Sequence, residues 1–175
     1  MSSNLHRPAT VKEIIHFSVG KSALGLILVA QSNQGICAIA LGDNAESLID
    51  ALQTRFSKLD IIADDNKLKN VISHIANWID KPVADLEFAL DLRGTPFQQQ
   101  VWRALRNIPL GKTATYTDIA NQINMPKAAR AVALACAANP VALAIPCHRV
   151  VRQDGNLSGY RWGIERKKAL LKKEI

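Results

Sequence analysis

Long hydrophobic runs are missing from this sequence. Its apolar stretches, such as residues 24–30 and 131–138, fall well short of the ~20 residues that a membrane-spanning helix needs. The N-terminus also lacks the basic region followed by an apolar one that marks a secretory signal. We therefore expect a cytoplasmic protein that has no membrane partner.

Cysteine and histidine are scarce. The three cysteines, Cys37, Cys136 and Cys147, are widely spaced and odd in number, which argues against a disulfide framework and fits a reducing compartment. No CxxC pair accompanies the four histidines, so the sequence has little with which to hold a zinc ion. We expect no metal site.

Acidic residues are few in the second half of the chain. Residues 1–90 hold 8 Lys+Arg against 10 Asp+Glu, and residues 91–175 hold 14 against 5, so the net charge of +7 divides into −2 and +9. This asymmetry indicates a polyanionic partner for the second half, because phosphate neutralisation with counterion release dominates non-specific affinity for DNA. On charge alone, the alternative is a basic surface that serves only solubility.

The first half alternates two hydrophobic periods. Residues 13–19, 25–30 and 35–41 are rich in Ile, Val and Leu and are separated by turn-forming segments, which predicts an antiparallel meander. Apolar residues at helical spacing then predict two helices, around residues 48–56 and 68–79. His74 and Trp78 lie on the second helix and are interpreted as packing or surface residues. Residues 1–87 are thus predicted to form an α/β domain with a small antiparallel sheet.

Residues 88–175 are predicted to form a second, mainly α-helical domain. A strand-like alternation over residues 88–92 leads into Thr95-Pro96-Phe97-Gln98, in which a capping residue, a proline and a possible capping box begin a helix. Another helix begins near Thr115 and breaks at residues 124–126, and a third runs from about residue 127 to residue 138. Two short helices joined by a tight turn match a helix-turn-helix, whose second helix conventionally enters a DNA groove.

The second helix of this pair has an unusual composition. After Lys127 and Arg130 its remaining residues, 131–138, are apolar and mostly alanine. A slim face permits close approach of a nucleic acid backbone, and Arg130 is placed to fill the space left by an extruded nucleotide. The alternative is a helix packed between neighbours, with Arg130 simply solvated.

Cys147 alone among the cysteines has a titratable base and a cation beside it in the sequence. It stands in the string Pro146-Cys147-His148-Arg149-Val150. A neighbouring His or Arg lowers the pKa of a thiol toward the physiological range, which populates the nucleophilic thiolate. We interpret Cys37, in a predicted strand, and Cys136, in the alanine-rich helix, as inert packing residues.

This string, with Asn139 eight positions upstream and Gly159-Tyr160-Arg161-Trp162-Gly163 downstream, resembles the O6-alkylguanine-DNA alkyltransferases, including the alkyltransferase portion of bacterial adaptive-response regulators. The resemblance extends from the helix at residues 97–102 to Glu174. For the first half it covers only the general pattern, and it implies a ribonuclease H-like arrangement there.

The resemblance implies a role for five residues. Cys147 is similar to the alkyl acceptor, and His148 to the base that keeps it ionised through a water. Glu174 is at the position of the acid that orients this histidine, which requires the predicted helix at residues 164–171 to be docked. Asn139 resembles the asparagine that braces the turn carrying the cysteine, and Tyr116 resembles the residue that contacts the guanine and promotes its protonation.

The resemblance also implies how DNA is held. Arg130 resembles the finger that replaces the flipped base, and Lys127, Ala128 and Ala129 are expected to contact DNA from the same helix in the minor groove. The partner is double-stranded DNA that contains alkylated guanine, and the protein is expected to act as a monomer.

A substrate pocket is expected around four further residues. The backbone carbonyls of Cys147 and Val150 would receive the guanine amino group, and Tyr160, Arg161 and Trp162 would line the same pocket. Arg161 and Trp162 are bulkier than the small residues that some relatives carry, so we hypothesise a tight pocket that accepts methyl readily and benzyl poorly.

The chemistry that follows is a single irreversible transfer. A thiolate is the side chain best suited to displacement at a saturated carbon, and a donor such as Tyr116 eases the departure of guanine. The alkylated base must swing out of the duplex to react, at a cost of a few kcal/mol. A thioether is a poor leaving group, so we expect one turnover, no cofactor, and action on O6 of guanine and also O4 of thymine.

Three alternatives compete with this interpretation. The helix-turn-helix could belong to a sequence-specific transcription factor with an incidental cysteine, which predicts operator binding and no mass change on alkylated DNA. A lesion binder that lacks the acceptor is disfavoured by the presence of Cys147. A thiol hydrolase is the weakest alternative, because its histidine normally comes from a distant part of the chain.

Overall fold

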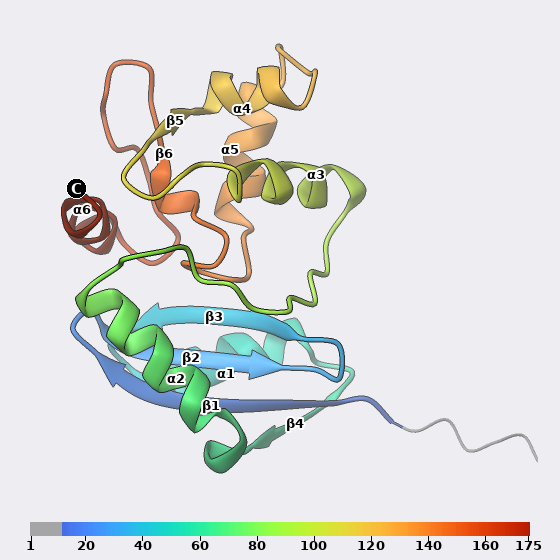
Figure 1. The fold of residues 1–175 in the computed structure, drawn as a ribbon. Helices are drawn as coiled ribbons and strands as arrows, with labels where there is room; N and C mark the ends of the chain where they lie inside the picture. The colour runs from blue at the N-terminus through green and yellow to red at the C-terminus, as the bar shows by residue number, and fades with distance from the viewer. Residues whose placement is uncertain (1–11) are drawn as a thin grey trace, which may run out of the picture.

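The structure is a computed structural model that describes residues 12–175. A four-stranded sheet forms the lower part of the molecule in Figure 1. Its strands are β1 (Ile14–Ser22), β2 (Gly25–Gln31), β3 (Ile36–Gly42) and β4 (Asp60–Ala63), in the order β3-β2-β1-β4. The predicted meander is β1-β2-β3, and both of its pairings are antiparallel. Strand β4, which no pattern in the sequence predicted, pairs in parallel with β1 and makes the sheet mixed.

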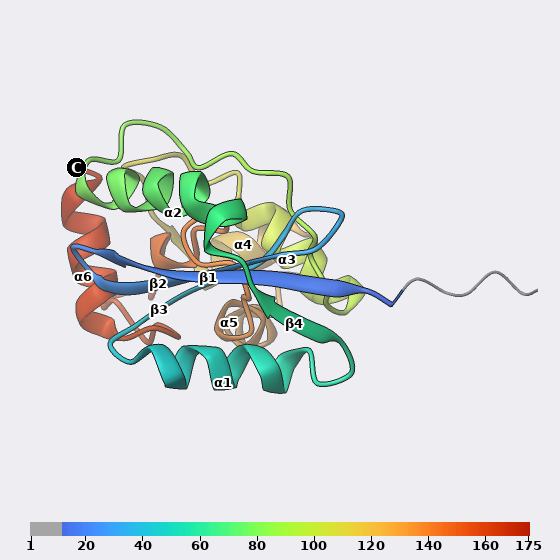
Figure 2. The same cartoon turned by 90° about the horizontal axis from the view of Figure 1, so that it is seen from below.

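Two helices cover the opposite faces of this sheet, as Figure 2 shows: α1 (Ala45–Arg55) on one side and α2 (Asp65–Asp80) on the other. Because side chains alternate between the faces of a strand, Leu28 and Ala30 pack in the cluster with α1 while Ile27 and Val29 pack in the cluster with α2. Both helices were predicted from their apolar spacing.

Residues 81–95 connect the two halves without a regular element. The strand predicted over residues 88–92 is not formed: Leu90 makes one isolated parallel bridge with Ile36. The two hydrogen bonds of this bridge join Ile36 N to Ala89 O at 2.8 Å and Asp91 N to Ile36 O at 2.9 Å. The alternating apolar residues therefore belong to an extended segment that makes one bridge to β3 and does not continue as a strand.

The upper, C-terminal part is mainly helical (Figure 1). Its helices are α3 (Pro96–Leu105), α4 (Tyr116–Gln122), α5 (Ala129–Ala137), the 3-10 turn η1 (Cys147–Arg149) and α6 (Ile164–Lys173). The short parallel strands β5 (Ala114–Thr115) and β6 (Val150–Val151) join this unit internally. An α/β unit followed by a mainly helical unit confirms the predicted fold class.

Local capping explains where the helices of this unit begin. Thr95 accepts from Gln98 N while Gln98 Oε1 accepts from Thr95 N, which completes the predicted capping box. Thr115 and Asp118 make the same reciprocal pair at α4. Helix α5 starts at Ala129, two residues later than expected, and has no side-chain cap.

The segment of residues 139–150, called the acceptor segment below because it carries Cys147, joins the two units. Ile39 in the middle of β3 donates its N–H to Pro140 O at 3.1 Å, and its carbonyl accepts from Ala142 N at 2.9 Å. Trp102, Leu105 and Val141 from the helical unit share one continuous core with residues of the sheet. None of the helices among residues 12–175 combines the length and the apolar content needed to span a bilayer.

Candidate active site

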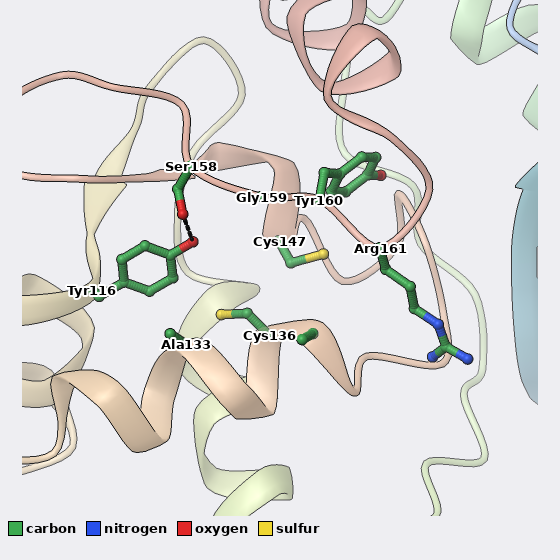
Figure 3. A pocket seen from close by; sticks show the side chains of 9 residues that line it. Tyr116, Ala133, Cys136, Cys147, Ser158, Gly159, Tyr160 and Arg161 are labelled. Carbon is green, nitrogen blue, oxygen red and sulfur yellow. Dashed lines mark hydrogen bonds between the residues drawn. The ribbon is translucent and has the colours of Figure 1, made fainter.

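A cavity of about 290 Å³ opens beside Cys147, between α5 and the loop that follows β6 (Figure 3). Cys147 is only 5% exposed, and its side chain reaches the cavity from η1. The residues that line the cavity come from four segments: Tyr116, Ala133, Cys136, Ala137, Cys147, Ser158, Gly159, Tyr160 and Arg161. A buried thiol with one open side is a candidate nucleophile.

Asn139 fixes the segment that carries this thiol. Its side-chain nitrogen donates to Ile145 O at 2.9 Å and to Cys147 Sγ at 3.2 Å, and its side-chain oxygen accepts from Val141 N at 2.9 Å. Every residue from 139 to 150 is buried. Leu143 adopts φ 72 within this segment, a conformation that a non-glycine residue holds only when its surroundings enforce it.

His148, the next residue after Cys147, is fully buried and is paired with Glu174. His148 Nε2 is 2.8 Å from Glu174 Oε1, and the carboxylate fixes the tautomer with the proton on Nε2. Nδ1 then carries a lone pair and no proton, and it has no hydrogen-bond partner among the described residues. Burial lowers the pKa of His148, so the imidazole is neutral and able to accept a proton at Nδ1.

Glu174 reaches this position from the C-terminal end of α6. It follows Lys167 and Leu170 by seven and four residues, and all three side chains point inward. Its hydrogen bonds from His148 and Arg149 hold the pKa of the carboxyl below its usual value against the opposing effect of burial. The docked helix that the resemblance required is therefore present.

From its place next to Cys147 in the sequence, Arg149 was expected to help activate the thiol. Its side chain does not face the thiol. Its guanidinium points the other way, to Glu174 at 3.0 Å, to Asp85 at 2.8 Å and to Ile108 O at 2.8 Å. Successive residues of a 3-10 turn point in different directions, so adjacency in sequence did not give adjacency in space.

The prediction of a lowered pKa for Cys147 is wrong for the free protein. Burial raises the pKa of Cys147 to about 11, and the hydrogen bond from Asn139 and the charge of Lys167 oppose this only in part. Desolvation dominates because the neighbouring imidazole is neutral and the neighbouring guanidinium is paired elsewhere. The resting acceptor is a thiol that must lose its proton during reaction.

Lys167 is a site residue that the sequence analysis did not identify. It is fully buried on α6, donates to Val150 O at 2.6 Å and Gly159 O at 3.3 Å, and has no acidic partner among residues 12–175. Its charge lowers the pKa of Cys147. A lysine at helical spacing among other lysines looks like a surface residue, and no sequence signal distinguishes it.

Tyr116 faces the cavity from the start of α4. Its hydroxyl donates to Ser158 Oγ at 3.2 Å across the opening (Figure 3). Burial raises the pKa of Tyr116, so the phenol keeps its proton and remains a donor. Ser158, which the sequence analysis did not identify, has φ 62 and holds Tyr116 in place.

The predicted pocket residues divide into two groups. Tyr160 and Arg161 line the cavity, and Arg161 Nη1 donates to Asn139 O at 2.7 Å. Trp162 is buried behind them, with its ring centroid 5.3 Å from that of Tyr160 and 5.4 Å from the guanidinium carbon of Arg161. Val150 is not among the residues that line the cavity, and its carbonyl accepts from Lys167.

Cys136 and Trp78 lie closer to the site than expected. Cys136 on α5 lines the same cavity, and burial raises the pKa of its thiol, as it does for Cys147. Burial likewise raises the pKa of Cys37 to about 11. Trp78 on α2 packs edge-on against His148 with ring centroids 6.5 Å apart. The first half, in which no chemistry was found, therefore helps to bury the imidazole.

The outer face of α5 continues from the cavity. Arg130 is exposed and lines a second, more open hollow of about 490 Å³ together with Tyr116, Ala133 and Arg152. Lys127 is exposed, and Ala128 and Ala129 are half-buried beside it. Among residues 12–175 no cluster of three or more His, Cys, Asp or Glu side chains is placed to hold a metal ion.

The described residues combine a cysteine that is braced by an asparagine beside a cavity, a buried His-Glu pair and a helical pair with a cationic outer face. Two family models match it: 6-O-methylguanine DNA methyltransferase, ribonuclease-like domain, over residues 15–92, and 6-O-methylguanine DNA methyltransferase, DNA binding domain, over residues 96–175.

The chain is also similar in sequence to DNA repair proteins. The chain is 49% identical over 160 residues to the bifunctional transcriptional activator/DNA repair enzyme Ada of Escherichia coli, which covers 91% of the chain but 45% of Ada. It is 38% identical over 156 residues to the inducible methylated-DNA–protein-cysteine methyltransferase of Bacillus subtilis, covering 89% and 82%. The chain thus spans about half the length of the Ada proteins that it matches.

Solved structures show the same architecture. The Mycobacterium tuberculosis protein OGT in complex with DNA superposes with a TM-score of 0.79 at 35% identity, over 91% of this chain and 92% of that one. The chain belongs to the 6-O-methylguanine DNA methyltransferase family. The resemblance inferred from the cysteine string and its surroundings is confirmed.

Proposed function

We propose that this protein repairs DNA by transferring an alkyl group from O6 of guanine to Cys147 Sγ, once per molecule and irreversibly. The observation that carries the proposal is the cysteine itself, which faces a cavity on one side and is braced by Asn139 and backed by the His148–Glu174 pair on the other. The names of the relatives, as DNA repair enzymes and methylated-DNA–protein-cysteine methyltransferases, support it.

The transfer is a displacement at the alkyl carbon. A bond forms between Cys147 Sγ and that carbon, the bond from carbon to O6 breaks, and its electron pair goes to the guanine. The thiol proton passes through a water to His148 Nδ1, and the Glu174 carboxylate stabilises the imidazolium that results. A neutral histidine with a free Nδ1 is the form that this step needs.

Tyr116 assists the leaving guanine. Its hydroxyl turns from Ser158 to the incoming base and donates its proton as negative charge develops, and solvent later restores it. The carbonyls of Cys147 and Val150 receive the guanine amino group. Val150 O keeps a lone pair for this contact, because Lys167 occupies only one.

DNA binds against the helix pair α4 and α5. Helix α5 lies in the minor groove, where the half-buried Ala128 and Ala129 permit close approach and Lys127 meets phosphate. Arg130 enters the base stack in place of the flipped nucleotide, whose exit costs a few kcal/mol, least for a poorly paired lesion. The substrate is duplex DNA, which the protein binds as a monomer. It acts in the bacterial cytoplasm, at the nucleoid. Alkyl groups on O4 of thymine are transferred in the same way.

The cavity sets the size of the alkyl group. Arg161 is tied to Asn139 O and stacked on Trp162, so the wall beside the thiol is held on two sides. A methyl group fits beside such a wall, whereas a benzyl group requires the arginine to move. Free O6-benzylguanine should therefore inactivate the protein much more slowly than a methylated oligonucleotide does, and comparable rates would contradict a tight pocket.

Intact-mass spectrometry after mixing with DNA that contains O6-methylguanine tests the proposal. We expect the mass of one methyl group on the peptide that contains Cys147 and no gain in Cys147→Ala. Cys136→Ala is the matched control, because it removes the other thiol of the same cavity and should still be methylated at Cys147. No gain in the native protein, or a gain at Cys136, would show the assignment to be wrong.

A further inference from the structure

Positive charge gathers on the N-terminal unit at the C-terminal end of α1. Arg55 is the last residue of this helix, Lys58 lies in the turn that follows, and both are exposed. Together with Phe56, Ser57, Leu59 and Arg93 they line an open hollow of about 520 Å³. This unit carries a net negative charge in sequence, so a local cluster of cations is unexpected there.

The guanidinium of Arg55 is already held in position. Its Nη2 donates to Arg93 O at 3.0 Å, and its carbon lies 5.7 Å from the centroid of the Phe56 ring. An arginine that is ordered before binding loses less side-chain entropy when it meets a ligand. The remaining N–H groups of Arg55 make no hydrogen bond among residues 12–175 and are free to donate.

The acids near this hollow are already paired. Glu13 and Asp91 pair with Arg93, and Asp60 pairs with Lys12. Arg55, Lys58 and Arg161 form no ion pair among the described residues. Arg93 is thus more than neutralised, because its two carboxylates leave this group at −1, whereas the other three cations have no ion-pair partner among the described residues. We call Arg55, Lys58 and Arg161 the cationic strip.

Arg161 joins this hollow to the acceptor cavity. It lines the cavity beside Cys147, and after burial its positive charge is the next largest cause that lowers the pKa of Arg55. Arg161 donates to Asn139 O, and the next residue, Pro140, accepts from Ile39 N in β3. Cys37 and Ala38 of the same strand share a buried cluster with Phe56 at the end of α1, so Arg161 and Arg55 both lie next to β3. In Figure 1 α5 lies above β3, the strand of the sheet nearest to the helical unit.

We propose that Arg55 and Lys58 bind phosphates of the DNA backbone, so that the strand passing the acceptor cavity at Arg161 continues across the N-terminal unit. An anion here relieves the repulsion between Arg55 and Arg161 and meets guanidinium donors suited to phosphate. The ligand is the phosphodiester of duplex DNA, since the strip is continuous with the cavity that receives its base. This inference rests on the proposed function.

The salt dependence of DNA binding tests it. Each phosphate contact contributes about −0.9 to the slope of log affinity against log salt. For Arg55→Gln/Lys58→Gln on a lesion-free duplex, we expect a slope shallower by about 1.8, which makes the loss of affinity about 12-fold larger at ~50 mM than at ~200 mM salt. Lys58→Gln alone changes an exposed turn residue and should show half the change in slope, about 0.9.

A charge-matched control lies on the other face of the sheet. Lys69→Gln/Lys81→Gln removes two exposed lysines at α2, opposite α1, and should leave the slope as in the native protein (Figure 2). An unchanged slope in the strip variants overturns the proposal. An equal change in the α2 variant also overturns it, because net charge alone would then be responsible.

Methyl transfer from free O6-methylguanine, which has no phosphate, separates this proposal from the proposed function. The strip variants should become methylated at Cys147 as fast as the native protein. Slower transfer in these variants would mean that the strip shapes the acceptor cavity, which overturns the phosphate assignment. A native protein that is never methylated would contradict the proposed function, while the salt slope would still decide the phosphate sites.

Discussion

Replacing Glu174 with glutamine removes the charge from the buried cluster behind the acceptor while keeping the size of the side chain. The carboxylate accepts from His148 Nε2 at 2.8 Å and from Arg149 Nη2 and Nε at 3.0 and 3.1 Å. All three side chains are at most 1% exposed. The variant leaves Arg149 with Asp85, which is 48% exposed, as its remaining charged partner.

The expected loss of stability is large. A hydrogen bond to a charged group contributes ~1.5–3 kcal/mol, and removing one partner of a buried ion pair costs ~3–5 kcal/mol because the other charge stays buried. For a chain of this size each kcal/mol shifts Tm by about 2–4 °C, so Glu174→Gln should lower Tm by roughly 6–20 °C. The transfer rate should fall by about 10²-fold or more, because His148 loses the group that fixes its tautomer.

The stability difference should depend on pH in a defined direction. The pKa of Glu174 in the folded protein lies below its ordinary value of 4.5, so the carboxylate stabilises the fold fully above that value. This contribution is lost as pH falls through the folded pKa. The gap between native and Glu174→Gln proteins should therefore be largest near neutral pH and shrink in acid.

Urea unfolding and single-turnover transfer, measured on the same preparations, check this. Asp85→Asn is the matched control: it removes the other acid of Arg149 but from a half-exposed position, where an ion pair contributes ~0–1 kcal/mol. It should change neither stability nor rate by much. If Glu174→Gln unfolds like the native protein, or if Asp85→Asn loses as much stability, the cluster is not the buried ion pair described here.

Three further outcomes follow from the site. Lys167→Met should unfold at the same or higher urea concentration, because a buried cation without an acidic partner is removed. The variant should nevertheless transfer the alkyl group about tenfold more slowly, which corresponds to ~1.4 kcal/mol in the activation free energy. An unchanged rate would mean that Lys167 does not act on the thiolate. Tyr116→Phe should keep its fold by circular dichroism and lose about 10²-fold in single-turnover rate, since no donor remains for the leaving guanine, and a rate near the native one would remove Tyr116 from the mechanism. The transfer rate should stay nearly level from about pH 7 to 9 and fall in acid below the lowered pKa of His148, because thiol and neutral imidazole together carry the reaction; a tenfold rise per pH unit would instead indicate direct attack by free thiolate.

Local patterns in the sequence predicted what depends on neighbours in the chain. The capping box at Thr95 forms as predicted, and Thr115 caps α4 where a helix was expected to begin, because each needs only residues three positions apart. The meander of β1 to β3 follows from alternation and turns. Strand β4 was missed because its burial pattern is mostly exposed, and it is a strand only through its pairing with β1, more than forty residues earlier.

The chemistry of the site was predicted only in part for the same reason. The nearness of Cys147 and His148 is visible in the sequence, but the direction in which Arg149 points and the burial that raises the pKa of Cys147 are properties of the packed turn. Lys167 looks like one of several surface lysines until α6 docks and places it beneath the cavity. The sign of the thiol pKa shift depended on this packing, which no spacing rule describes.

The bridge between Ile39 and the acceptor segment has a consequence for the history of the chain. Because Pro140 O accepts from Ile39 N and Ala142 N donates to Ile39 O on the edge strand β3, the register of β3 and the placement of the reactive sulfur are set together. A chimera that joins this helical half to the sheet of a distant relative should lose protection of the Ala142 amide in hydrogen exchange whenever that register slips. The half that performs no chemistry is therefore constrained to co-evolve with the half that does.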